Sequence, residues 1–116
     1  MHCFTGKKSL VKKVIDNNWF LTAPTCITRS TQFQENIKLA PINQIFCETD
    51  APYLSPFKDA RNLSGQISAP IKMGKRNEPA HVRHTAEKLA EIKNIPVPEL
   101  IRLTSENARR LFNKLI

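Results

Sequence analysis

The sequence lacks a cysteine framework and long apolar runs. Cys3, Cys26 and Cys47 are odd in number and lack C-x-x-C spacing, so they indicate neither a disulfide framework nor a zinc knuckle. They are typical of buried thiols in an intracellular protein. No apolar run reaches the length of a membrane span, and neither a signal peptide nor a lipidation motif is visible. We therefore expect a cytoplasmic protein with no membrane partner.

Acidic residues are few relative to basic ones. Lys and Arg number 18 against 10 Asp and Glu, which gives a net charge of +8 and favours anionic partners such as nucleic acid. The basic residues are spread along the whole chain instead of forming one cluster. The charge alone is therefore more typical of solvated helix faces than of a nucleic-acid-binding stripe.

Strand-like and helix-like segments alternate along the chain. The spacing of Leu10, Val11, Val14 and Ile15 predicts a helix over residues 7–18 that buries these four side chains. Downstream, the pattern predicts a strand over 19–23, a helix over 32–39 and a second strand that ends at Asp50. Strands that alternate with helices are typical of parallel βα units, so the predicted fold class is α/β.

A long irregular segment follows the second strand. Prolines, glycines and basic residues from Ala51 to Arg76 predict a loop that lies where a substrate lid would lie. Asn77 then caps a predicted helix that ends at Asn94 and buries a stripe of four apolar residues, Val82, Ala86, Leu89 and Ile92. Two shorter helices are predicted after it, one that starts at Pro98 and one that is capped by Thr104 or Ser105.

Two carboxylates end the second predicted strand abruptly. Glu48 and Asp50 follow its apolar residues, at the C-terminal edge where α/β proteins place their chemistry. His2 adds an imidazole near the start of the chain. Because imidazole and carboxylate are suitable ligands for Mg²⁺, Mn²⁺ or Zn²⁺, the three residues indicate a metal site.

Three blocks carry a family resemblance. His2-Cys3-Phe4-Thr5-Gly6, Glu48-Thr49-Asp50-Ala51-Pro52-Tyr53-Leu54 and Arg76-Asn77-Glu78-Pro79-Ala80-His81 resemble, in order and spacing, motifs of the TatD family of metal-dependent deoxyribonucleases. The resemblance covers nearly the whole chain but corresponds to the C-terminal part of that family. It implies an α/β fold, a C-terminal fragment of a TIM-type (β/α)8 barrel of the metal-dependent hydrolase kind.

The length fits that interpretation. A closed eight-stranded α/β barrel takes about 250 residues, whereas this chain has 116. Residues 1–116 would supply the region of strands six to eight and the C-terminal covering helices, with 51–76 as the active-site loop.

The resemblance also implies roles for individual residues. His2 and Asp50 would bind one or two divalent metal ions, and Asp50 and Glu48 would be catalytic, with Asp50 taking a proton from metal-bound water. Arg76 and Asn77 would hold a DNA phosphate at a helix N-terminus, and Tyr53 would stack on a base. The implied function is cleavage of phosphodiester bonds in DNA, as single strands or strand ends.

The chain departs from the family pattern in one respect. The family also has a His-x-His pair, a glutamate and a further histidine on earlier strands, and these would lie before Met1. Because an open catalytic metal site normally keeps three protein ligands, we expect a truncated protein with impaired activity. An uncovered parallel sheet edge further predicts self-association or a need for the N-terminal part of the barrel. His81 and His84, on the covering helix, are expected to be ordinary helix residues.

Two other functions remain compatible with the sequence. A non-enzymatic basic module would bind nucleic acid in a salt-sensitive manner, without metal. A related barrel hydrolase would use the same metal site on another ester or an amide. The motifs do not distinguish among the three metals, between DNA and RNA, or between cleavage from an end and internal cleavage.

Overall fold

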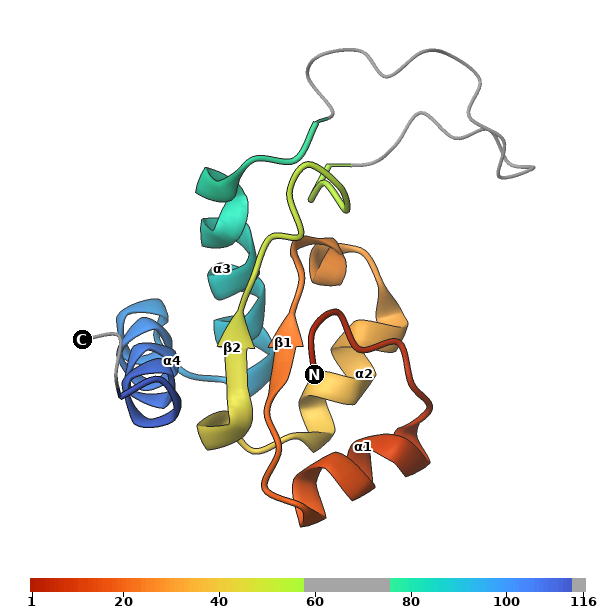
Figure 1. The fold of residues 1–116 in the computed structure, drawn as a ribbon. Helices are drawn as coiled ribbons and strands as arrows, with labels where there is room; N and C mark the ends of the chain where they lie inside the picture. The colour runs from red at the N-terminus through yellow and green to blue at the C-terminus, as the bar shows by residue number, and fades with distance from the viewer. Residues whose placement is uncertain (58–75, 114–116) are drawn as a thin grey trace.

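The computed structural model describes residues 1–57 and 76–113 (Figure 1). Its elements, in chain order, are α1 (Lys8–Asp16), β1 (Leu21–Ala23), the 3-10 helix η1 (Thr25–Thr28), α2 (Thr31–Leu39), η2 (Ile42–Gln44), β2 (Ile45–Cys47), η4 (Pro79–His81), α3 (Val82–Lys93) and α4 (Val97–Leu111). Strands and helices alternate up to β2, as predicted. Most of the predicted loop, residues 58–75, lies outside the described residues. Within those that are described, no helix is long and apolar enough to cross a membrane.

The strands run parallel and side by side. In the β1–β2 pair, Leu21 lies opposite Ile45. On the other side of β1, the Met1 amino group donates to Phe20 O at 2.7 Å and Thr22 N donates to Met1 O at 3.1 Å. Because this pair of bonds is the pattern of a parallel bridge, the first residues of the chain extend the ladder beside β1. The ends of three parallel segments therefore meet at one edge of the sheet.

One face of the sheet carries the core. Leu21 and Ile45 are buried against apolar side chains from η1 and all four α-helices, namely Val11, Val14, Ile27, Ile37, Ala86, Leu89, Ala90 and Leu100. Figure 1 shows α3 behind the two strands, with α2 and α4 on either side of it. The burial of these side chains fixes the helices to the sheet, because removing apolar surface from water is the main favourable term in folding.

The opposite face of the sheet is less covered. Thr22 and Phe46, which point away from the core, are only half-buried. The Phe20 ring stacks on the Phe46 ring, with the two ring centroids 4.8 Å apart. The ring centroid of Phe112 lies 6.0 Å from that of Phe46. Parallel sheets are normally covered on both faces. This aromatic face is therefore less buried than the face of a parallel sheet usually is.

The prediction of two helices after Pro98 is wrong. A single helix, α4, runs from Val97 to Leu111. Thr104 does not cap a new helix, because its hydroxyl donates to Leu100 O at 3.0 Å within the same helix. This back-bonding satisfies a mid-helix threonine. Leu100, Thr104 and Asn107 form one buried stripe, and the spacing of that stripe keeps the helix continuous.

Two apolar residues predicted to face the core are exposed instead. Leu10 is 44% exposed and Val82 is 38% exposed, although Val11, Val14, Ala86 and Leu89 are buried as predicted. The buried stripe of each helix is therefore narrower than its apolar pattern. Cys3 and Cys47, predicted to be buried with Cys26, are only half-buried. The predicted end of α3 at Asn94 is confirmed, since Asn94 takes the left-handed conformation with φ 53°.

Candidate metal site at the C-terminal edge of the sheet

β2 delivers two carboxylates to the sheet edge where the first residues of the chain also end. Glu48 N donates to Ala23 O at 3.0 Å, so Glu48 still belongs to the ladder with β1. Asp50 lies two residues farther on, beyond the strand. His2 follows Met1, which pairs with Leu21 on the far side of β1. The topology therefore brings His2, Glu48 and Asp50 to one place although 46 and 48 positions separate them.

His2 lies between the two carboxylates. Its Nδ1 contacts Glu48 Oε2, and its Nε2 lies 3.1 Å from Asp50 Oδ1. Cys3 N donates to the second oxygen of Glu48 at 3.0 Å, so the carboxylate is held from two sides. The His2 side chain is 66% exposed, whereas those of Glu48 and Asp50 are 14% and 27% exposed. The three residues form an open site with a solvent-facing imidazole.

The electrostatics of the site favour a positive charge. The hydrogen bond and the negative charge of Glu48, together with Asp50, raise the pKa of His2 above its ordinary value. When Nδ1–H donates to Glu48, a neutral His2 presents the lone pair of Nε2 toward Asp50. Two electron-pair donors that face each other need a proton or a cation between them.

The spacing of those donors suits a cation. Ligands about 2.1 Å from an octahedral ion lie about 3.0 Å apart at adjacent corners, and Nε2 and Oδ1 are separated by 3.1 Å. However, the described residues contain no group of three or more His, Cys, Asp or Glu side chains able to hold a metal. His2 and Asp50 thus fit part of a metal shell, and any further protein ligands would not come from the described residues.

Threonines support the site, and the sequence analysis missed them. Thr22 Oγ1 accepts from Cys3 N at 3.0 Å, and Thr85 Oγ1, from α3, donates to Glu48 O at 3.1 Å. Thr25 Oγ1, from η1, donates to Thr49 O at 2.7 Å. A threonine directly after Pro24 was the available signal, because hydroxyls at the end of a strand commonly bind local carbonyls.

Asn77 occupies a different place from the one predicted. It is only 1% exposed, and its side chain donates to the backbone on both sides of Asp50, at Thr49 O and Tyr53 O. The residue that caps η4 is Glu78, whose N–H bonds to His81 Nδ1 at 3.1 Å. The predicted phosphate contact is therefore not available to the Asn77 side chain in this conformation, because no solvent-facing surface is left for it.

Arg76 and Tyr53 remain accessible beside the site. Tyr53 is 71% exposed and Arg76 is also exposed. Asn77 N donates to Pro52 O at 3.1 Å, which places Arg76 close to the segment that carries Tyr53. Both side chains are free to meet a ligand.

His81 and His84 form a separate cluster. Their ring centroids are 5.8 Å apart, and Phe57 contacts both rings edge-on at 5.2 and 5.6 Å. Neither histidine contacts Glu48 or Asp50. They pack the start of α3 against the segment after β2.

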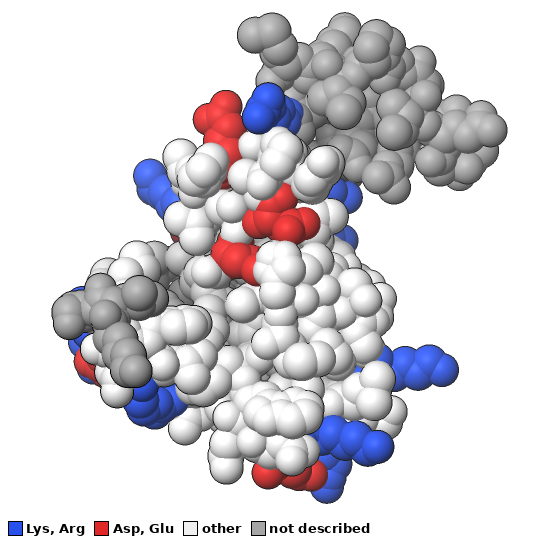
Figure 2. All heavy atoms as spheres, viewed as in Figure 1, with Lys and Arg blue, Asp and Glu red and all other residues white. Residues whose placement is uncertain are grey.

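The charged side chains are unevenly placed. Figure 2 shows acidic side chains near the upper end of the sheet, whereas the described Lys and Arg side chains lie around the rim of this face. Despite the net charge of +8, the candidate site is locally acidic. Carboxylates repel a negatively charged phosphate. An anionic substrate would therefore need a cation between itself and this site.

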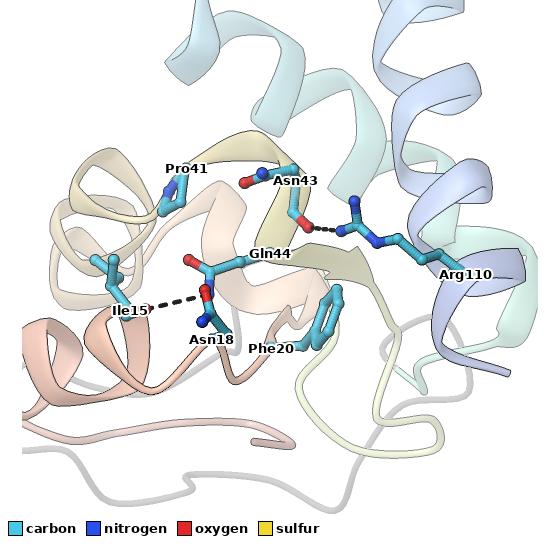
Figure 3. Close-up of a pocket in the computed structure, with 7 residues that line it drawn as sticks. All are labelled: Ile15, Asn18, Phe20, Pro41, Asn43, Gln44 and Arg110. Carbon is cyan, nitrogen blue, oxygen red and sulfur yellow. Dashed lines mark hydrogen bonds between the residues drawn. The ribbon is translucent and has the colours of Figure 1, made fainter.

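A pocket at the other end of the sheet is unrelated to this site (Figure 3). Its lining includes residues just before each strand, such as Phe20 and Gln44. Arg110 Nη2 donates to Asn43 O, and the guanidinium lies 5.6 Å from the Phe20 ring centroid. Gln44 Nε2 donates to Ile15 O at 3.3 Å. These internal contacts join the ends of α1 and α4 to the residues just before the strands.

Comparison with known proteins agrees with the motifs. The family model of TatD related DNase matches residues 1–113. The chain is 34% identical over 114 residues to "Uncharacterized metal-dependent hydrolase YabD" of Bacillus subtilis, covering 97% of this chain and 40% of the relative. It is 35% identical over 115 residues to "Deoxyribonuclease TATDN3" of Homo sapiens, covering 99% and 36%.

A solved structure shows the same fold. The TatD family hydrolase of Entamoeba histolytica superposes with a TM-score of 0.74 at 21% identity, over 94% of this chain and 40% of that one. The chain thus spans about two fifths of the length of the proteins it matches. Because the family model and these relatives cover almost all of its residues, the chain belongs to the TatD-related DNase family.

Proposed function

We propose that this chain supplies part of the active site of a metal-dependent hydrolase that cleaves phosphodiester bonds in DNA. The observation that carries the proposal is the approach of His2 Nε2 to Asp50 Oδ1, 3.1 Å apart at the C-terminal edge of parallel strands. Two relatives bear names that agree, one a metal-dependent hydrolase and the other a deoxyribonuclease. In the complete (β/α)8 barrel, residues 1–3, β1 and β2 would be the sixth, seventh and eighth strands.

His2 and Asp50 would hold a divalent ion, Mg²⁺, Mn²⁺ or Zn²⁺. When bound, such an ion supplies Lewis-acid polarisation of a phosphoryl oxygen and lowers the pKa of a bound water. Glu48 contacts His2 Nδ1 and would thereby leave Nε2 available to the ion, as partners of metal-bound histidines do. The Asp50 carboxylate would also accept a proton from the attacking water.

Substrate contacts would come from the accessible residues beside the site. Arg76 would bind a phosphate by its charge, and Tyr53 would stack on an unpaired base. The segment 51–76 would cover the substrate. Cleavage by a related mechanism at another ester or an amide remains a second substrate class, to be separated by substrate screening.

The remaining ligands would have to come from elsewhere. An open catalytic metal site normally has three protein ligands, and the described residues offer His2 and Asp50. The half-buried aromatic face of the sheet, Phe20 and Phe46, would pack on the part of a TatD-type barrel that this chain does not contain, or on a second copy. We therefore expect weak activity from the chain alone.

Incubation of the purified chain with single-stranded DNA and Mg²⁺, Mn²⁺ or Zn²⁺ tests the proposal. The Asp50→Asn variant is compared with Asp16→Asn, which changes an exposed carboxylate at the end of α1. Slow cleavage that EDTA and Asp50→Asn abolish, and that Asp16→Asn leaves unchanged, is the expected result. Salt-sensitive DNA binding that persists in EDTA and in Asp50→Asn, without any cleavage, would favour the non-enzymatic basic module.

A further inference from the structure

Asn77 joins three segments of the chain through one buried amide. Its Nδ2 lies 3.0 Å from Thr25 Oγ1, 2.6 Å from Thr49 O and 2.6 Å from Tyr53 O. Its Oδ1 accepts from Glu78 N at 3.0 Å. A buried amide that has lost its contact with water is stable only when its donors and acceptor are paired, and here both ends are paired.

The contacts of Asn77 belong to a larger network. Thr25 Oγ1 accepts from Asn77 and donates to Thr49 O at 2.7 Å, and Asn77 N donates to Pro52 O at 3.1 Å. We call Thr25, Thr49, Tyr53 and Asn77 the clasp. Residues on both sides of the predicted active-site loop meet in the clasp, so it holds the two ends of that segment together.

Asp50 lies between Thr49 and Tyr53, two residues of the clasp. Its backbone is left-handed, with φ 58°, a conformation that is uncommon for residues other than glycine. Such conformations persist where the surrounding structure imposes them. The carbonyl before Asp50 is bound by Thr25 and Asn77, and Asp50 O itself accepts from Tyr53 N at 2.9 Å. The direction of the Asp50 side chain therefore depends on the clasp.

We propose that Asn77 is a positioning residue, which imposes the left-handed conformation of Asp50 and so aims the Asp50 carboxylate at His2 Nε2. This inference rests on the proposed metal site and assigns Asn77 a role other than substrate contact. A substrate contact would require the amide to leave three oxygens and reach solvent, and each of those oxygens would then lose its bond to Asn77.

Asn107 provides a matched control for Asn77. It is a second buried asparagine whose Nδ2 holds two backbone carbonyls, Ile42 O at 2.7 Å and Ile45 O at 2.9 Å. These carbonyls lie at the start of η2 and at the start of β2, whereas Asn77 acts beyond the end of β2. Asn77→Ala and Asn107→Ala therefore remove similar buried bonds, and only Asn77→Ala changes the surroundings of Asp50.

Amide hydrogen exchange and NMR on the full chain test the assignment. The amides of Ala51 and Tyr53 donate to Thr49 Oγ1 and Asp50 O, within the turn that Asn77 holds. In Asn77→Ala we expect these two amides to exchange about tenfold faster, because the turn opens more often. The nuclear Overhauser effect between the His2 ring and the Asp50 β protons is expected to disappear. Asn107→Ala should change neither readout.

Mn²⁺ binding adds a readout that lost stability alone does not move. With Mn²⁺ as the probe, we expect Asn77→Ala to weaken affinity about tenfold relative to Asn107→Ala, as loss of an outer support of a metal ligand does. If the two variants bind Mn²⁺ equally and show equal exchange at Ala51 and Tyr53, Asn77 only stabilises the fold and the proposal is overturned.

A second variant covers the case in which Asn77→Ala does not fold. Thr25→Val removes the hydroxyl that bridges Asn77 and Thr49 but keeps the side-chain shape. It should produce the same local changes, in smaller measure, and its failure to do so would refute the clasp. If the unmodified chain shows no Mn²⁺ effect at His2 and Asp50, the proposed metal site fails, and the exchange measurements still decide the role of Asn77.

Discussion

His2 Nε2 lies 3.1 Å from Asp50 Oδ1, across 48 positions of the sequence. Neither residue is within a strand, and each follows a segment of a parallel ladder whose ends meet at one edge. The contact therefore depends on register. A shift of either segment by one residue would turn its side chain to the other face of the sheet, because side chains alternate along a strand.

Removing either member of this pair should weaken metal binding. We expect His2→Ala and Asp50→Asn each to lower the affinity of the chain for Mn²⁺ at least about tenfold, since each would remove a proposed direct ligand. Isothermal titration calorimetry measures the change. His84→Ala, on α3 and outside the site, serves as the control and should leave the affinity unchanged. Equal affinities in all three variants would contradict the site.

The thiols of Cys26 and Cys47 should resist alkylation. Burial raises the pKa of Cys26 and of Cys47 to about 11, because the thiolate loses its hydration. At pH 8 we expect iodoacetamide to modify both residues slowly in the folded chain and rapidly in guanidinium chloride, as followed by mass spectrometry. Modification of either residue in the folded chain at the rate of a free thiol would contradict this expectation.

The same shifts set a direction for alkaline stability. The folded-state pKa of each thiol lies above the unfolded value of 9.0, so the neutral thiol favours the folded chain. This contribution is fully present below pH 9 and is lost as the pH rises toward 11. A Cys47→Ala variant should lose less stability than the unmodified chain over that interval, in urea titrations at each pH.

Lys93 should stabilise the contact between α2 and α3. Its Nζ donates to the carbonyls at the end of α2, to Ile37 O at 2.6 Å and also to Ala40 O. Those carbonyls have no partner within their own helix. We expect Lys93→Met to lower the free energy of unfolding by about 1–3 kcal/mol, because charged hydrogen bonds contribute that much. Chemical denaturation measures it, with the exposed Lys12→Met, expected to change little, as the control.

The half-buried aromatic face should drive association. We expect the isolated chain to self-associate with increasing concentration in sedimentation velocity, and Phe46→Ser to reduce that association. Ile101→Ser, which removes an apolar side chain that is 50% exposed on α4, is the matched control and should not. A monodisperse monomer that melts sharply and reversibly would show that the exposed face needs no partner.

Local patterns predicted most of the elements. Apolar spacing located both strands and the helices α1, α2 and α3, and Asn94 marked the end of α3 as predicted. The same spacing failed at α4, where a threonine that looked like a cap bonds backward within one helix. A cap and a mid-helix threonine have the same local sequence, and the burial of Thr104 beside Leu100 decides between them.

The roles of individual site residues were harder to predict from the sequence. His2, Glu48 and Asp50 could be named from their motifs, but the threonines that hold them could not, because a hydroxyl gives no signal until its acceptor is near. Asn77 is the clearest case. Its sequence context, before Glu78 and Pro79, is that of a helix cap. In the structure, its side chain instead donates to Thr49 O and Tyr53 O.

The amino-acid sequence by itself determined which residues are able to bind a cation and which segments become strands and helices, since both follow from side-chain chemistry and short-range periodicity. Tertiary structure alone decided that His2 meets Asp50, that Asn77 is buried in the clasp and that one face of the sheet remains half exposed. These relations join positions tens of residues apart. They depend on strand register and on the packing of helices against the sheet, which no local pattern specifies.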